Sequence, residues 1–288
     1  MSLFTDLTAS VNAVKPNRTT MRNYDLLLFI AALTLVAVGL LMVYSASIAL
    51  ADGRRYASYG RYYFVARHGL FVISGFIAAA LVYTVPISAW QRITIGLFGF
   101  SLFLLLLVLI LGKEVNHAVR WLPLGPINFQ PSELMKLSAL LYAADYTVRK
   151  QAHMQNIWRG FAPMACALIA VAGLLLLEPD LGALMVVVSI AIGILFLGGI
   201  NGKIFVALAG LLPALFALVI WLAPWRRARF FAYLDPWNPA TTQSSGYQLA
   251  HSLIAIGRGE WFGVGLGSSV EKLHYLPEAH TDFIMAVI

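Results

Sequence analysis

The sequence predicts an all-α, polytopic membrane protein, and two observations carry this prediction: its composition and the length of its apolar segments. Of 288 residues, 60% are hydrophobic and only 11% are charged, whereas soluble domains carry about 25% charged residues. The mean hydropathy is +0.79. Several apolar segments are long enough to cross the hydrocarbon core of a bilayer, which needs about 20 residues of helix. We therefore expect a bundle of helices for which lipid is the main solvent.

Seven apolar segments are interpreted as complete transmembrane helices. They lie at 26–48, 70–87, 93–111, 134–147, 161–177, 183–198 and 204–224. An eighth begins near Phe283 and stops after six apolar residues, so we predict a truncated eighth helix and a chain that is a fragment of a longer protein. Residues 1–24 are polar and lack the short apolar core of a signal peptide. They are predicted to form a cytoplasmic tail, followed by a transmembrane domain over 25–288.

The longest stretch between spans, residues 225–282, is predicted to be a large extracytoplasmic loop that carries short interfacial helices. Its basic and aromatic start, 225–239, is expected to lie along the membrane surface. The following residues have a helical period in which Gln248, His251 and Ser252 form a polar stripe. A half-buried helix with one polar face suits the rim of a cavity.

The charge balance and the single cysteine exclude several classes of protein. The net charge is +7, but the 20 Lys and Arg are scattered between apolar segments and form no basic face for nucleic acid. Anionic membrane lipids or an anionic lipid-linked substrate are the expected partners. Cys166 is the only cysteine, so no intrachain disulfide is possible. The sequence also lacks a phosphate-binding P-loop and the HExxH and GxSxG motifs.

Two pairs of residues are candidates for a site, one at membrane depth and one just outside the third span. Ionisable side chains at membrane depth are costly and usually functional. Glu133 and Lys136 are three residues apart and share a helical face, just after Pro131, which suits a first helical turn. They either form an ion pair that orients the helix, or Lys136 faces a polar cavity and meets a phosphate. Arg120 and Trp121 follow the third span. They either anchor that end at the interface or recognise a sugar or phosphate.

A cluster of polar residues precedes the truncated helix, in the segment YLPEAHTDFIMAVI (275–288). It consists of Glu278, His280, Thr281 and Asp282. Asp282 either caps the helix or is a carboxylate held where water meets lipid, which is a suitable setting for a general base.

These segments together resemble the SEDS family (shape, elongation, division and sporulation), and its division branch more than its elongation branch. The resemblance is carried, in family order, by YSAS (44–47), RWLPLGPINFQPSELMK (120–136), EPDLG (178–182), YLDPW (233–237), GYQLAHSLIAIGRGEWFGVGLGSS (246–269) and KLHYLPEAHTDFI (272–284).

The resemblance implies ten spans with both ends in the cytoplasm, although the distribution of Lys and Arg weakly favours the opposite orientation. It implies an inverting peptidoglycan glycosyltransferase that polymerises lipid II on the outer side of the inner membrane, at the division septum. The implied partners are a class B penicillin-binding transpeptidase and other division proteins. Asp282 matches the family's essential acidic residue in its HTDF motif. The rival interpretations are a lipid II flippase or transporter, and a non-catalytic scaffold of the division machinery.

Our hypothesis for the reaction makes Asp282 the base that deprotonates a sugar hydroxyl. Because the leaving group is an anion, it needs neutralising charge, which Arg120, Lys136 and either Arg229 or Arg258 supply, with or without a divalent cation (Mg²⁺ or Mn²⁺). Gln248, Ser252 and His280 are expected to bind sugar hydroxyls or the peptide of the substrate. The predicted substrate-binding residues also include Trp121 and Glu133.

Overall fold

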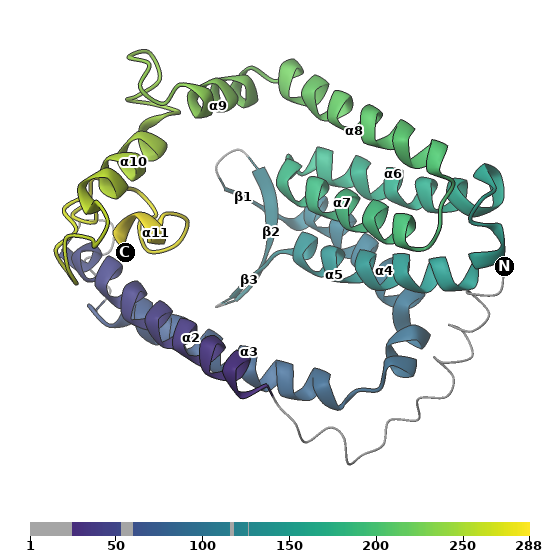
Figure 1. Ribbon diagram of the computed structural model, residues 1–288, viewed down its shortest axis with the longest axis horizontal. Helices are drawn as coiled ribbons and strands as arrows, with labels where there is room; N and C mark the ends of the chain where they lie inside the picture. Colours follow the sequence, from purple (N-terminus) through teal and green to yellow (C-terminus); the bar gives the residue numbers. More distant parts are fainter. Residues whose placement is uncertain (1–24, 53–59, 116–117, 126) are drawn as a thin grey trace. The chain divides into compact units, whose positions relative to one another are not determined.

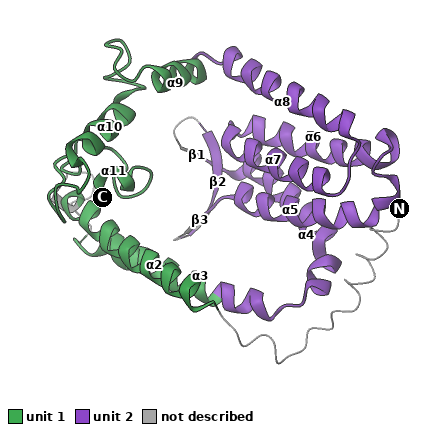
Figure 2. Ribbon diagram, in the orientation of Figure 1, with its two compact units in different colours: residues 1–77, 225–288 green, residues 78–224 purple. Residues whose placement is uncertain are grey.

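The structure is a computed structural model that describes residues 25–52, 60–115, 118–125 and 127–288; the predicted tail, 1–24, lies outside these residues. The described chain is mainly helical, with one small antiparallel sheet (Figure 1). It divides into two compact units (Figure 2). Unit 1 comprises residues 1–77 and 225–288, and unit 2 comprises residues 78–224.

Five helices of the described chain are long and apolar enough to cross a membrane. They are α2 (Leu26–Ser47), α3 (Tyr63–Thr84), α4 (Ile87–Leu111), α6 (Ala162–Leu177, extended by the π-helix η4, Ile157–Phe161) and α8 (Gly202–Leu222). Two further helices occupy the other predicted spans. The first, α7 (Leu181–Leu197), is apolar but shorter, and the second, α5 (Pro131–Arg149), carries charged residues. The prediction of a helical, multi-pass membrane protein is confirmed.

The boundary between the second and third predicted spans was wrong. The apolar pattern predicted a loop at 88–92, but α3 ends at Thr84 and α4 begins at Ile87. The break falls at Pro86, which has the extended backbone of a helix N-cap. Proline cannot donate a backbone hydrogen bond and is tolerated at a helix start, so it ends one helix and admits the next. The polar residues after it form the first turns of α4 instead of a loop.

The core of unit 2 is built around α5, which packs against α4 and α7. This core contains ten buried side chains: Phe98, Leu105, Met135, Ala139, Val171, Leu175, Ala183, Leu184, Val187 and Val188. On α5 itself many of the buried residues are small, including Ser132, Ser138 and Ala143. Small side chains allow membrane helices to approach closely. Because protein surrounds α5 on two sides, this helix can carry charges that a lipid-facing helix could not.

A three-stranded sheet follows α4, and the sequence analysis did not predict it. Its strands are β1 (Lys113–Val115), β2 (Ala118–Leu124) and β3 (Ile127–Phe129), paired antiparallel in that order. Gly125, which has a φ of 69°, lies in the connection between β2 and β3. A left-handed conformation of this kind favours glycine. The sheet holds Arg120 and Trp121 on its central strand, next to α4 and α5.

In unit 1, α2 packs against the end of the described chain. Met42 and Ala46 of α2 share a buried cluster with Ala255, Leu276, Ala279, Ala286 and Val287. The stretch predicted as a large loop contains two helices, α9 (Pro224–Leu234) and α10 (Tyr247–Gly259), before the short α11 (Ile284–Val287). The prediction of short helices within 225–282 is therefore confirmed.

Gly160 lies where η4 passes close to the preceding turn. Its carbonyl accepts a hydrogen bond from the Tyr146 hydroxyl at 2.7 Å, and a Cβ at this position would lie 2.3 Å from the His153 carbonyl oxygen. We expect Gly160→Ala to lower the free energy of unfolding in detergent by about 1–3 kcal/mol, the usual cost of overpacking. Denaturant titration followed by circular dichroism measures it.

Gly173→Ala is the matched control, because a Cβ there meets nothing within 4 Å. In a helix interior this change is expected to be neutral or stabilising by up to about 1 kcal/mol. Equal stabilities of the two variants would contradict the close approach at Gly160.

Candidate functional site

The predicted site residues are divided between the two units. Unit 2 holds Arg120, Trp121, Glu133 and Lys136, and unit 1 holds Asp282, Gln248, Ser252, His280, Arg229 and Arg258. The convergence of Arg120 and Lys136 of unit 2 with Asp282 of unit 1 on one cavity stays a prediction.

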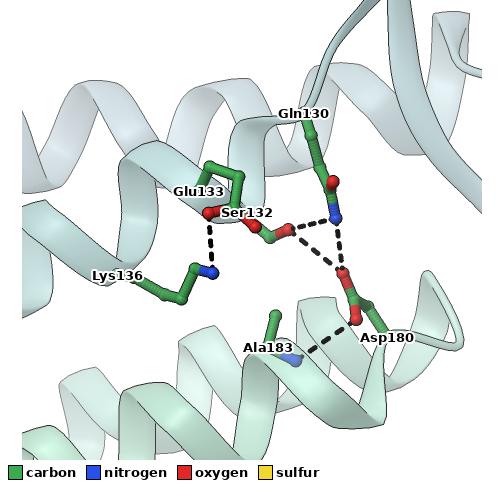
Figure 3. A network of polar contacts seen from close by, with 6 residues as sticks. All are labelled: Gln130, Ser132, Glu133, Lys136, Asp180 and Ala183. Carbon is green, nitrogen blue, oxygen red and sulfur yellow. Dashed lines mark hydrogen bonds and ion pairs between the residues drawn. The ribbon is translucent and has the colours of Figure 1, made fainter. Parts of the chain in front are cut away.

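The predicted pairing of Glu133 and Lys136 is present at the start of α5 (Figure 3). The Lys136 ammonium lies 2.6 Å from a Glu133 carboxylate oxygen. Glu133 is in the first turn of the helix, where the helix dipole favours a negative charge, and Pro131 occupies the start of the helix as predicted. The Lys136 side chain is 28% exposed. The pair therefore fixes Lys136 on one face of α5 while leaving part of its side chain accessible.

Asp180 connects the N-terminus of α5 to the N-terminus of α7 (Figure 3). Its carboxylate accepts hydrogen bonds from Gln130 at 3.1 Å, Ser132 at 3.0 Å and the backbone N–H of Ala183 at 3.2 Å. The last contact is a helix N-cap, and the first two come from a segment about 50 positions earlier. The sequence analysis quoted Asp180 only as part of a motif. Its place directly before an apolar helix was the signal for the cap, but nothing local indicated the contacts with Gln130 and Ser132.

The Arg120 side chain reaches the turn between α6 and α7. Its guanidinium donates a hydrogen bond to the Pro179 carbonyl, while its Nε is buried without a partner among the described residues. Glu178, at the end of α6, is 0% exposed, and neither carboxylate oxygen has a described hydrogen-bond partner. Burial, and secondarily the charge of Asp180, raises the pKa of Glu178 to about 8, against the opposing effect of Arg120. Glu178 is a candidate residue that the sequence analysis missed.

In unit 1, Glu271 gathers two side chains of α10. One of its carboxylate oxygens lies 2.8 Å from His251 Nδ1, and the other accepts a hydrogen bond from Arg258 at 3.0 Å. The Glu271 side chain is 6% exposed, whereas that of Arg258 is 56% exposed. This buried acid therefore holds the loop after α10 against the helix, and Arg258 remains partly available to a ligand.

Two other predicted residues on α10 have different surroundings. Gln248 is exposed. Ser252 is buried, and its hydroxyl donates to the Leu249 carbonyl at 2.8 Å. The predicted polar stripe therefore offers Gln248 to solvent, while the hydroxyl of Ser252 is used within the helix.

Two arginines of α9 lie close to an aromatic ring. The guanidinium carbons of Arg226 and Arg229 are 4.9 Å and 5.5 Å from the centroid of the Trp225 ring. Such cation–π contacts are favourable, and Arg and Trp together are typical of a helix at a membrane interface. Arg229 thus belongs to a basic, aromatic helix of the predicted interfacial kind.

Asp282 is exposed and does not cap α11. The residue at the N-cap position is Phe283, and no side-chain hydrogen bond is made there. The neighbouring Thr281 donates its hydroxyl to the Glu278 carboxylate at 2.9 Å. Among the described residues, none donates a hydrogen bond to the Asp282 carboxylate. The capping alternative is therefore wrong, and the carboxylate is accessible immediately before an apolar helix.

His280 connects this acidic segment to a cavity of about 520 Å³ within unit 1. The cavity is lined by Gly39, Val43, Tyr63, Phe64, Arg67, His68, Phe71, His280, Thr281 and Ile284. The ring of His280 packs edge-on against the ring of Phe64, with 4.8 Å between the ring centroids. Its Nδ1 is buried without a partner among the described residues. Burial lowers the pKa of His280, while the charges of Glu278 and Asp282 oppose that effect. A mostly apolar cavity with a few basic groups suits an amphiphile that carries negative charge.

A metal site is not evident in the parts of the chain that the structure describes. No three His, Cys, Asp or Glu side chains there come together in a way that could hold a metal ion.

The fold and these sites define a multi-pass membrane protein with an exposed acid beside an apolar cavity. The chain belongs to the FtsW, RodA and SpoVE family of cell cycle proteins, whose family model matches residues 25–288. This confirms the resemblance inferred from the motifs.

Curated relatives extend this assignment. The chain is 55% identical over 284 residues to the probable peptidoglycan glycosyltransferase FtsW of Burkholderia thailandensis, and the match covers 98% of this chain and 62% of the relative. It is 54% identical to the protein of the same name from Aromatoleum aromaticum, and this match covers 93% of this chain and 65% of the relative. The chain thus spans less than two thirds of the length of these two relatives.

Solved structures show the same fold. A chain of a peptidoglycan synthase complex that coordinates polymerization and crosslinking matches with a TM-score of 0.62 at 29% identity. The match covers 83% of this chain and 66% of that chain. The rod shape determining protein RodA of Thermus thermophilus matches with a TM-score of 0.51 at 24% identity. The match covers 92% of this chain and 95% of RodA. At this identity the RodA likeness concerns the fold alone.

The elevated pKa of Glu178 predicts a pH-dependent stability. Because its pKa of about 8 in the folded protein exceeds the ordinary glutamate pKa of 4.5, the folded state binds more protons than the unfolded state between these values. The free energy of unfolding should therefore fall as the pH rises from 5 to 8, and this contribution should level off above that. Denaturant titration of the wild type and of Glu178→Gln across this pH range measures the contribution of Glu178 to the free energy of unfolding, because the amide of the variant cannot ionise.

Glu260→Gln, which changes an exposed carboxylate, is the control and should follow the wild type. A Glu178→Gln variant with the same pH slope as the wild type would show that Glu178 is already ionised in the folded protein.

Proposed function

We propose that the full-length protein containing this chain is a peptidoglycan glycosyltransferase that polymerises lipid II. The observation that carries the proposal is the accessible Asp282 carboxylate beside the cavity that His280 borders. The names of the curated relatives, probable peptidoglycan glycosyltransferase FtsW, support the same reaction.

The proposed reaction is a direct displacement at the anomeric carbon of a lipid-linked sugar. Asp282 takes the proton of the acceptor sugar's 4-hydroxyl as the new carbon–oxygen bond forms. The bond from the anomeric carbon to the pyrophosphate oxygen breaks, and the electron pair leaves with the prenyl pyrophosphate. Attack from the face opposite the leaving group inverts the configuration. Because the leaving group departs as an anion, no second carboxylic acid is needed to protonate it, in contrast to glycoside hydrolysis.

Positive side chains are proposed to stabilise the departing pyrophosphate. Lys136 is held in place by Glu133, and Arg120 by its contact with the Pro179 carbonyl, so both cations are positioned before substrate arrives. Arg229 and the exposed part of Arg258 are further candidates. A divalent cation, Mg²⁺ or Mn²⁺, would add to the same neutralisation when bound with the pyrophosphate.

Neutral and aromatic groups are proposed to bind the sugars and peptide. Gln248 is exposed on α10, and His280 has a ring nitrogen without a described partner. Trp121, on the central strand of the sheet, offers a ring against which a sugar can pack. Ser252 is a weaker candidate than the sequence suggested, since its hydroxyl is already donated to the backbone.

We further propose that the protein acts at the division septum with its N-terminus in the cytoplasm, so that Asp282 faces the outer side where glycan strands are made. A class B penicillin-binding transpeptidase and other division proteins are the proposed partners. Support comes from the name FtsW of the relatives and from the matching chain of a peptidoglycan synthase complex.

The proposal predicts that Asp282→Asn in the full-length protein abolishes glycan polymerisation. The amide cannot accept the hydroxyl proton, so product should fall by at least about 100-fold, the usual scale of general-base catalysis. Gel analysis of polymer made from purified lipid II measures this, and binding of lipid II should remain because the side chain keeps its size.

Glu260→Gln is the matched control, since it also neutralises an exposed carboxylate of unit 1. Its polymerisation rate should equal that of the wild type. Wild-type rates in Asp282→Asn would remove Asp282 from the role of base.

The charged pair within α5 also suits a flippase, because ionisable residues inside a membrane bundle often mark transport pathways. The two functions separate in detergent, where translocation has no meaning. We expect the purified full-length protein to make glycan polymer from lipid II in micelles. Absence of polymer there, together with lipid II scrambling in vesicles, would favour transport over the enzyme.

A further inference from the structure

Lys272 is a buried cation that the proposed reaction does not use. Only 5% of the residue is exposed. Its ammonium donates a hydrogen bond to the hydroxyl of Ser45, at 3.3 Å, and no carboxylate of the described residues pairs with it. Buried charges in proteins are normally paired with an opposite charge. A single neutral hydroxyl leaves most of the charge of Lys272 uncompensated.

The adjacent acid does not supply the missing charge. Glu271 directs its two carboxylate oxygens to His251 and Arg258 on α10. Burial lowers the pKa of Lys272, as expected for an ammonium that lacks a counter-charge. An anion bound beside Lys272 would remove this cost.

A glycine-rich loop lies next to the ammonium. Gly263, Gly265 and Gly267 all have positive φ, and a Cβ on Gly267 would lie 4.0 Å from the Lys272 Nζ. The backbone N–H groups of Gly265, Leu266 and Gly267 donate to no carbonyl of the described chain. Consecutive free N–H groups in a loop with left-handed residues can form a concave anion-binding site. The loop and the ammonium therefore offer the donors that a phosphate needs.

The position of Ser45 indicates the depth of this site. Ser45 lies in the last turn of α2, within the span that ends at Leu50. The end of a transmembrane helix is at the level of the lipid headgroups, where the phosphates of amphiphiles are found. An anion at Lys272 would thus sit at the depth of a lipid-linked phosphate.

We propose that Lys272, Ser45 and the loop around Gly267 form a binding site for the phosphate groups of an amphiphile, namely the pyrophosphate of a prenyl-linked substrate or product. This inference rests on the proposed function for the identity of the lipid, but not for the existence of the site. It assigns Lys272 to binding, separate from the base Asp282.

The test measures binding of undecaprenyl pyrophosphate to the full-length protein in detergent, by microscale thermophoresis. Lys272→Met keeps the apolar stem of the side chain and removes its charge. We expect its Kd for undecaprenyl pyrophosphate to rise at least about tenfold, the effect of losing one hydrogen bond to a charged group. Binding of the uncharged alcohol undecaprenol should not change. An unchanged Kd for the pyrophosphate in Lys272→Met overturns the proposal.

Two further variants guard against indirect effects. Lys203→Met removes an exposed lysine in the first turn of α8 and should bind undecaprenyl pyrophosphate as the wild type does. An equal loss in this variant would show a general charge effect and overturn the site. Ser45→Ala removes one hydroxyl and keeps the ammonium, so we expect a Kd about threefold higher. It serves as the test should Lys272→Met not fold, and wild-type affinity in it would then count against the site.

Competition with phosphatidylglycerol distinguishes the two sources of phosphate. If the site takes the prenyl pyrophosphate, equimolar phosphatidylglycerol should leave the measured Kd unchanged. Equal displacement by this lipid would contradict the assignment to substrate and indicate a site for bilayer phospholipid. Neither result depends on turnover, so loss of polymerisation in Asp282→Asn and loss of binding in Lys272→Met are separate outcomes.

Discussion

The structure within each unit depends on one constraint: a charge taken out of water must be compensated by a partner or lose its ionised form. Four solutions are present in the described chain. Glu133 and Lys136 pair with each other, Asp180 accepts three hydrogen bonds, Glu271 faces two basic side chains, and Glu178 has its pKa raised to about 8. Two of these solutions also join segments far apart in the chain: Asp180 contacts the start of α5, and Glu271 contacts α10. The polar residues therefore determine which helix ends lie together, while the apolar residues determine only that the helices are in the membrane.

These contacts explain how an apolar bundle can hold a reactive site steady. Because lipid is as apolar as the helices, burial alone gives little preference for one helix pairing over another. Hydrogen bonds from Gln130 and Ser132 to Asp180 fix the start of α5 beside the start of α7. Lys136 lies on the following turn of α5, so its position follows from this connection. A cation held in this way loses little freedom when it meets an anionic ligand, which makes the interaction more effective.

The sequence was sufficient for those features that depend on local pattern. Apolar length predicted the helical spans, and the 3.6-residue period predicted α10. It was insufficient where the outcome depended on tertiary contacts. The contact of Ser132 with Asp180 joins residues 48 positions apart, and no local signal indicates it. The sheet after α4 was missed because its strands are short, and two of them have only three residues each. Asp282 was selected because it matches a family motif. Its residue type and its position before an apolar segment were equally consistent with a helix cap.

The candidate sites combine one accessible acid before α11 with several cations, and this combination agrees with the proposed chemistry better than with glycoside hydrolysis. Glycoside hydrolysis needs an acid for the leaving oxygen as well as a base or nucleophile, and places two carboxyl groups on either side of one bond. A pyrophosphate leaves as an anion, so the acid is replaced by positive charge. The described chain has one accessible carboxylate directly before α11, whereas its other prominent groups are partly exposed cations such as Lys136 and Arg258. Acids close to these cations, Glu133 and Glu271, are already paired with them and therefore position the cations instead of competing for a proton. An accessible base and positioned cations, without a second acid, are the groups that displacement of a lipid pyrophosphate by a sugar hydroxyl requires.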